Sequence, residues 1–167
     1  MTELLTLAAL AALAWATLAY RARRALPAPL RGATLHLNEK PLSITEPVSL
    51  RGRPDQVWRT RDNTLVITDT KTRKSARVFP ADRLQLSAYA LLLEETQDLP
   101  LHHVAFIRVP ATLGSVFRPI DLLPREAVLR AVDRHHALLS AQTPPRTNAS
   151  EALCRHCGHR EICPRWA

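Results

Sequence analysis

The order of segments in this sequence predicts an α/β fold, with a small central mixed sheet flanked by helices. Two strand-like runs joined by a polar tip come first, within Leu50–Lys71. A helical pattern follows from about Asp82, then two strand-like runs at Val104–Val109 and Ser115–Leu122, and a last helix that opens at Pro124. Strands that alternate with helices in this way favour a sheet covered by helices. At 167 residues the chain is long enough for one domain with its own core.

The first two runs, Leu50–Arg59 and Thr64–Lys71, form a predicted β-hairpin. They are rich in Val, Ile, Thr and Trp, and Asp62 and Asn63 interrupt them as turn residues do. Folding the chain about this tip brings Asp55 level with the end of the second run. The hairpin therefore predicts that residues 14 to 16 positions apart in sequence meet at one end of the sheet.

Asp69 and Lys71 lie at that end and point to the same face, because side chains alternate along a strand. With Asp55 they bring two carboxylates and an ammonium together. Converging carboxylates need a cation between them, and hard divalent ions often need only one or two protein carboxylates. The pattern predicts a Mg²⁺ or Mn²⁺ site with a lysine beside it. The alternative is that these are ordinary exposed polar residues on a half-buried strand.

The helix that follows carries two polar residues on one face. Asp82 is its predicted N-cap, and Gln85 and Tyr89 are one turn apart. The residues at helical spacing that predict the packed face are Leu84, Ala88, Leu91, Leu92 and Glu95. Gln85 and Tyr89 flank this face. They either belong to the carboxylate site or are a half-buried core tyrosine and its exposed neighbour.

Four pieces, in this order, make the sequence similar to a known family. They are Gly52–Asp55, Asp69–Lys71, Gln85–Tyr89 and the cysteine-containing segment Cys154–Pro164. Together they resemble the PD-(D/E)XK nuclease superfamily, and within it the RecB-like exonucleases and the CRISPR-associated exonucleases that carry an iron–sulfur cluster. The resemblance runs from about residue 46 to the end of the chain. It implies a restriction-endonuclease-like core.

The resemblance also implies what individual residues do. Asp55, Asp69 and the carbonyl of Thr70 would bind Mg²⁺ or Mn²⁺, and Lys71 would be the catalytic lysine. The substrate it implies is DNA, with ends or single strands preferred to intact duplex.

By the same resemblance Gln85 and Tyr89 would support the site and the DNA. Related exonucleases usually begin with a helix whose histidine or acidic residue completes the metal site, and here a hydrophobic segment stands in its place. His36 is the candidate for that missing ligand. The alternative is that His36 is a surface or packing residue. Without a third ligand, metal binding would be weaker and the activity itself is in question.

The positive charge of the chain predicts a polyanionic partner. The formal net charge is +8, and residues 1–20 contain no charged residue except Glu3. The rest of the chain therefore carries an excess of +9, which favours nucleic acid or an acidic membrane surface. The candidates for DNA phosphate contacts are Arg51, Arg53, Arg73, Lys74 and Arg77.

An uncharged segment at Leu4–Tyr20, followed at once by three arginines, predicts a membrane anchor. Its 17 residues would span about 25 Å as a helix, close to the thickness of a bilayer core. The arginines predict a single-pass protein of the inner (cytoplasmic) membrane with the remainder in the cytoplasm. The alternative is an Ala/Leu-rich core helix. A linker and N-terminal segment at residues 25–45 would follow this anchor at residues 1–24.

All three cysteines, Cys154, Cys157 and Cys163, fall within ten residues. Clustered thiolates in a reducing compartment suit an iron–sulfur cluster or zinc. By resemblance they would hold a [4Fe–4S] cluster with one upstream cysteine, and this chain has no cysteine before residue 154. The fourth ligand would then be His36, His156, His159 or water. Zinc held by three cysteines and a histidine is one alternative, and a site without metal is another.

The sequence therefore predicts a membrane-tethered, metal-dependent deoxyribonuclease core at residues 46–142 and a metal-binding tail at residues 143–167. Two other readings stay open. One is a module that keeps the nuclease fold, binds DNA or a partner at the membrane, and has no turnover. The other is a membrane scaffold with a zinc-binding tail and a basic face on anionic lipid.

Overall fold

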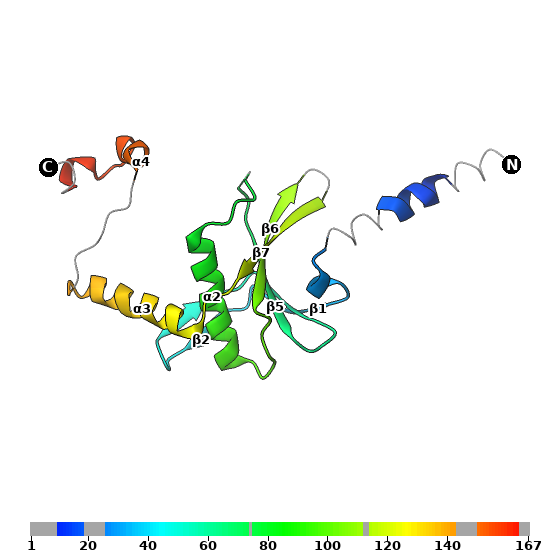
Figure 1. Ribbon diagram of the computed structural model, residues 1–167, viewed down its shortest axis with the longest axis horizontal. Coiled ribbons are helices and arrows are strands. Elements are labelled where there is room, and N and C mark those ends of the chain that lie inside the picture. Colours follow the sequence, from blue (N-terminus) through cyan, green and yellow to red (C-terminus); the bar gives the residue numbers. More distant parts are fainter. Residues whose placement is uncertain (1–9, 19–25, 74, 112–113, 143–149, 164–167) are drawn as a thin grey trace. The chain divides into compact units, whose positions relative to one another are not determined.

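The computed structural model describes residues 10–18, 26–73, 75–111, 114–142 and 150–163. The chain divides into two compact units, Met1–Ala131 and Val132–Ala167. The first contains the strands and the helix α2 that covers them (Figure 1).

A five-stranded mixed sheet forms the centre of the first unit. Its strand order is β1-β4-β5-β6-β7, and all neighbours are antiparallel except the parallel pair β5 and β6. A separate antiparallel pair, β2 and β3, lies against α2. The predicted α/β class with a mixed sheet and helices is confirmed. The strands are β1 (Thr34–Asn38), β2 (Leu42–Ile44), β3 (Leu50–Gly52), β4 (Gln56–Arg59), β5 (Leu65–Thr70), β6 (Val104–Ala111) and β7 (Gly114–Asp121).

The predicted hairpin is the pair β4–β5, with Gln56 opposite Thr68 and Arg59 opposite Leu65. Asn63 takes the left-handed conformation, with a φ of 58°, which suits an asparagine in a tight turn. The first strand is shorter than expected, because Leu50–Gly52 pairs with β2 instead of continuing into β4. A proline, Pro54, separates the two segments, and proline interrupts a strand because it has no N–H to donate.

Helix α2 (Pro80–Thr96) supplies one side of the main core. Leu65 and Ile67 of β5 belong to the same buried cluster as the helix residues, while Val66 points to the opposite face and packs with Leu30 and Phe106. The central strand β5 is thus buried on both faces, as a strand paired with a parallel neighbour commonly is.

The packed face of α2 differs from the predicted one. Leu84 is 38% exposed and Glu95 is exposed, whereas the buried helix residues are Asp82, Leu86, Ser87, Ala90, Leu91, Leu92 and Leu93. The helix contacts both the main sheet and the β2–β3 pair, so its buried surface is wider than one stripe. Asp82 is also not the N-cap. Phe79 is the cap and Pro80 the first helical residue, and Asp82 accepts the N–H of Phe79 at 2.8 Å.

The linker and N-terminal segment forms ordered structure. A short 3₁₀ helix, η1 (Ala28–Leu30), buries Leu30, and β1 is the edge strand of the main sheet. Further along the chain, α3 (Arg125–Leu139) starts directly after Pro124, as predicted. The tail contains the short helix α4 (Glu151–Arg155), capped by the Ser150 side chain, and the 3₁₀ helix η2 (Arg160–Ile162).

The structure contradicts the predicted membrane anchor. Residues 10–18 are helical, and the rest of Leu4–Tyr20 lies outside the described residues. Within the described ranges no helix has the length and apolar character needed to cross a membrane. The predicted single-pass localisation in the inner membrane, and with it the membrane as a partner, is therefore wrong on this finding.

Gly52 marks the closest approach of β3 to α2. A Cβ at this position would lie 2.8 Å from Leu92 Cδ1 and 2.9 Å from Tyr89 Cε1. Since Leu92 is fully buried, its side chain has little room to move.

We therefore expect Gly52→Ala to lower the free energy of unfolding by about 1–3 kcal/mol through overpacking. Urea titration followed by circular dichroism measures this. Gly158→Ala is the matched control, because no described heavy atom lies within 4 Å of its Cβ position. Equal midpoints for Gly52→Ala and the unmodified chain would contradict the expected clash.

Candidate active site

Asp69 lies near the end of β5 and faces α2, because it follows Leu65 and Ile67 at alternate positions of the strand. It is only 2% exposed. Burial raises the pKa of the Asp69 carboxyl, the close approach and charge of the Lys71 ammonium oppose this, and the carboxylates of Asp55 and Asp82 add to it. An acidic group is thus held where desolvation disfavours its charged form.

Asp55 is held at the same end of the sheet by its side chain and its backbone. Its Oδ2 accepts the backbone N–H of Thr70 at 2.8 Å. Its backbone carbonyl accepts the N–H of Glu39 at 2.8 Å, from a turn in which Glu39 has a φ of 47°. The structure therefore brings Asp55 level with Asp69 and Thr70, where the hairpin predicted it.

Lys71 stands among three polar side chains. Its Nζ lies 2.8 Å from Asp69 Oδ2, donates to Gln85 Oε1 at 2.8 Å, and lies 3.9 Å from Asp82 Oδ1. The approach to Asp69 is an ion pair without the angles of a hydrogen bond, so the buried Asp69 Oδ2 has no hydrogen-bond donor among the described residues. Such an oxygen retains a lone pair for another partner.

Gln85 and Tyr89 share one face of α2, as predicted, and they join the same network. Gln85 Nε2 donates to the Tyr89 hydroxyl at 2.9 Å and approaches Asp69 Oδ1 at 3.4 Å. With the bond from Lys71 to its Oε1, the amide of Gln85 links the lysine, the carboxylate and the tyrosine. The carboxamide orientation follows from this network.

Asp82 is a site residue that the sequence pattern did not reveal. It is 5% exposed. Arg73 donates two hydrogen bonds to its carboxylate, from Nη1 to Oδ1 at 3.0 Å and from Nη2 to Oδ2 at 2.7 Å. The hydrogen bond from Arg73 holds the pKa of the Asp82 carboxyl below its usual value. The available signal was its position three residues before Gln85 on one helix, which places both on the same side.

The basic residues predicted to contact phosphates separate into two groups. Arg73 is bound to Asp82 and lies 4.8 Å from the centroid of the Phe79 ring, and the Arg77 guanidinium lies 5.4 Å from the same ring. Arg51 and Arg53 are exposed, without an ion-pair partner in the described part of the chain. Lys74 lies outside the described residues.

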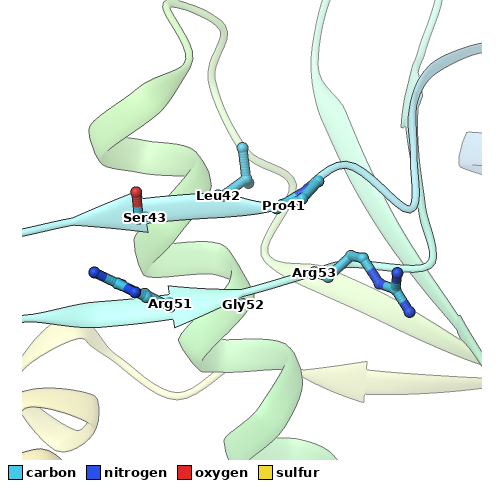
Figure 2. Close-up of a pocket in the computed structure, with 6 residues that line it drawn as sticks. All are labelled: Pro41, Leu42, Ser43, Arg51, Gly52 and Arg53. Atoms are coloured by element: carbon cyan, nitrogen blue, oxygen red, sulfur yellow. The ribbon is translucent and has the colours of Figure 1, made fainter.

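Arg51 and Arg53 line an open groove of about 500 Å³ over the β2–β3 pair, and their side chains extend to either side of Gly52 (Figure 2). The groove is lined by Pro41, Leu42, Ser43, Arg51, Gly52 and Arg53. Its glycine touches the ring of Tyr89, and its last arginine lies two residues before Asp55. The groove is therefore next to the carboxylate network.

His36 is not part of this network. Its Nε2 lies 3.0 Å from Oε1 of Gln97, at the far end of α2. Gln85 and Gln97 are separated by about 18 Å along the helix axis. No three His, Cys, Asp or Glu residues gather as a metal site within the described ranges. The structure thus brings together the two aspartates and the lysine, and places the predicted histidine elsewhere.

The family of this chain follows from its similarity to known proteins. The model of the PD-(D/E)XK nuclease superfamily matches residues 3–164. The chain belongs to the PD-(D/E)XK nuclease superfamily. The sequence motifs predicted this superfamily, and the match confirms it.

Two individual proteins are similar to this superfamily member. A CRISPR-associated exonuclease Cas4/endonuclease Cas1 fusion from Myxococcus xanthus (strain DK1622) is 34% identical over 126 residues, 71% of this chain. The chain spans 22% of that relative's length. The crystal structure of SSO0001 matches with a TM-score of 0.48 and 19% identity, over 78% of this chain and 60% of that one.

The donor set of this nuclease-superfamily site fits a hard divalent cation. Asp55 and Asp69 offer carboxylate oxygens, one of them buried and without a hydrogen-bond donor. Mg²⁺ commonly uses one or two protein carboxylates and keeps several waters, so two aspartates are a sufficient start.

The cysteines of the tail are differently exposed. Cys154 is buried in α4, Cys163 is half-buried and Cys157 is exposed, and all three are free. The described tail does not gather three of them as a metal site. Metal binding here would need coupled rearrangement, and it stays a prediction from the spacing.

The Asp82–Arg73 pair predicts a pH dependence of stability. Because the pKa of Asp82 is lowered in the folded state, its contribution is present above the unfolded value of about 3.9 and is lost as the pH falls through the folded pKa. We expect Asp82→Asn to lower the free energy of unfolding by about 2 kcal/mol at neutral pH. The difference should shrink below a pH of about 4.

Urea titrations across that pH range measure this difference. Asp98→Asn, which removes an exposed carboxylate beyond the other end of α2, is the control. A deficit for Asp82→Asn that is independent of pH would contradict the assigned ion pair.

Proposed function

We propose that this member of the nuclease superfamily is a divalent-cation-dependent deoxyribonuclease that hydrolyses phosphodiester bonds at DNA ends or in single strands. The observation that carries the proposal is the convergence of Asp55, Asp69 and Lys71 beside Gln85. Two carboxylates, an ammonium and an amide at one end of the sheet are the groups needed to bind a hard cation and act on a phosphate.

Asp55 and Asp69 would hold Mg²⁺ or Mn²⁺, with the Thr70 carbonyl as a further ligand. Asp55 uses one oxygen for the N–H of Thr70, which orients the carboxylate and leaves its other oxygen for the cation. When bound, the cation lowers the pKa of a water and stabilises the charge that develops on the phosphate.

Lys71 acts from the position that Gln85 gives it. The hydrogen bond from Lys71 Nζ to Gln85 Oε1 holds the ammonium beside the carboxylates. The Lys71 side chain is 23% exposed, so it is largely shielded from solvent. A compact ammonium there orients the attacking water or neutralises charge on the phosphate. Tyr89 and Gln85 support each other through their 2.9 Å hydrogen bond.

The Arg51–Arg53 groove is the proposed path of the DNA backbone toward this site. Arg51 belongs to β3 and Arg53 directly follows the end of that strand, so both lie on the segment that leads to Asp55. The two guanidiniums lack ion-pair partners among the described residues, so each is available to a phosphate. The groove meets Tyr89 through Gly52, so a strand bound in it is adjacent to the carboxylates.

The Myxococcus relative supports an exonuclease activity, because its name includes one. The chain matches 22% of that protein, so an association with further domains or partners is part of the proposal. The close spacing of Cys154, Cys157 and Cys163 supports an iron–sulfur cluster or zinc in the tail.

We expect Asp69→Ala and Lys71→Ala each to reduce cleavage of labelled single-stranded DNA by at least about 10³-fold with Mn²⁺. The aspartate supplies the cation site and the lysine the charge beside it. Full-length protein incubated with labelled DNA, and with RNA of the same sequence, gives the rates on a denaturing gel.

Asp62→Ala is the control, because it removes an exposed aspartate from the β4–β5 turn. A cleavage rate for Asp69→Ala within tenfold of the rate of the unmodified chain would refute the proposed site. DNA binding without cleavage by the unmodified chain would favour the non-catalytic module.

We expect Arg51→Gln and Arg53→Gln each to raise KM for DNA with little change in kcat. Each should lower the slope of log Kd against log salt concentration by about one, because each removes one phosphate contact. Fluorescence anisotropy at several salt concentrations measures the slope.

Arg130→Gln makes the same change of charge at an exposed position of α3 that does not line the groove. If all three variants show the same decrease in the salt dependence of binding, the decrease comes from net charge and the groove is not the path of the DNA.

A further inference from the structure

Lys71 occupies the position that a divalent cation would compete for. Its ammonium lies 2.8 Å from Asp69 Oδ2, the buried oxygen that has no hydrogen-bond donor. Two cations on one buried carboxylate repel each other strongly, because the low dielectric of the interior screens them poorly. Binding of a cation at Asp69 therefore requires the ammonium to move.

Asp82 offers the ammonium another carboxylate nearby. Its Oδ1 is 3.9 Å from Lys71 Nζ, about 1 Å longer than a charge-assisted hydrogen bond. Oδ2 already accepts from Arg73 and from the backbone of Phe79, whereas Oδ1 accepts from Arg73 Nη1 alone among the residues that the structure describes. Oδ1 therefore has a lone pair for Lys71.

The surroundings of Asp82 keep it in place for this purpose. The two hydrogen bonds from the Arg73 guanidinium and the one from the N–H of Phe79 hold the Asp82 carboxylate in place, and the Asp82 side chain is 7% exposed. Arg73 in turn donates to the carbonyl of Arg77 at 2.6 Å. Because the two hydrogen bonds from Arg73 partly compensate the charge of Asp82, its direct effect on a cation at Asp69 is smaller than that of an unpaired carboxylate.

We propose that Asp82 is a positioning residue that becomes the ion-pair partner of Lys71 when a divalent cation occupies Asp69. This inference rests on the proposed cation site. Gln85 remains a shared acceptor, so Lys71 exchanges one carboxylate for the other by a small displacement and stays beside the reacting phosphate. Without Asp82, Asp69 is the one carboxylate within ion-pair distance of Lys71 among the described residues, so the ammonium competes with the cation.

The test is Mn²⁺ binding by the full-length protein without DNA, with free Mn²⁺ measured by electron paramagnetic resonance. Four chains form a double-mutant cycle: the unmodified protein, Asp82→Asn, Lys71→Met and the double variant. Asp98→Asn controls for the loss of one carboxylate elsewhere on the surface.

We expect Asp82→Asn to weaken Mn²⁺ binding by at least about fivefold when Lys71 is present and by less than about twofold in the Lys71→Met chain. Lys71→Met alone should tighten Mn²⁺ binding, because the competing ammonium is gone. An equal loss in both backgrounds, or no loss in either, overturns the role of Asp82. If the unmodified chain does not bind Mn²⁺, the cation site fails and this inference fails with it.

A second measurement needs no variant and so does not depend on whether Asp82→Asn folds. In a crystal structure of the unmodified chain with Mn²⁺, Lys71 Nζ should lie within hydrogen-bond distance of Asp82 Oδ1 and away from Asp69 Oδ2. An ammonium that remains on Asp69 beside bound Mn²⁺ overturns the proposal, although the cation site itself would then be established.

Discussion

Burial of the Asp69 carboxylate at the end of the central strand is the constraint around which the site is arranged. A carboxylate that is 2% exposed needs compensating partners, since desolvation of an isolated charge is costly. Lys71 and Gln85 supply them in this structure, and one oxygen is still without a hydrogen-bond donor. The same burial that makes the position unfavourable for a lone charge makes it favourable for a carboxylate shared with a cation.

The sheet topology produces this arrangement from short-range features. The turn at Asn63 returns the chain so that Asp55 meets the backbone of Thr70, and α2 covers the β5 face that carries Asp69. Gly52 lets β3 approach α2 closely enough to touch Tyr89. The groove, the tyrosine and the carboxylates are thus neighbours through contacts that β5 and β3 make, two of them with α2.

The charged residues at this end of the sheet form two linked pairs rather than a single metal cage. Asp69 pairs with Lys71 and Asp82 with Arg73, and Lys71 lies between the two carboxylates. Near-neutral pairing of this kind stabilises an apo site that would otherwise hold converging negative charges. In the proposed function, this pairing would require the site to rearrange on binding a cation, which a set of unpaired acids would not need to do.

The sequence by itself determined the hairpin, the helix with Gln85 and Tyr89 on one face, and the meeting of Asp55 with Asp69, because these follow from turn residues and from fixed periodicities along the chain. It did not determine which face of the leucine-rich α2 is buried, since Leu84 and Leu86 are equally apolar and only contact with two sheets separates them. Nor did it determine the Asp82–Arg73 pair or the distance of His36 from the site, because neither depends on local pattern. Tertiary structure decided those features, since ion pairs between residues on separate elements depend on where packing places the elements.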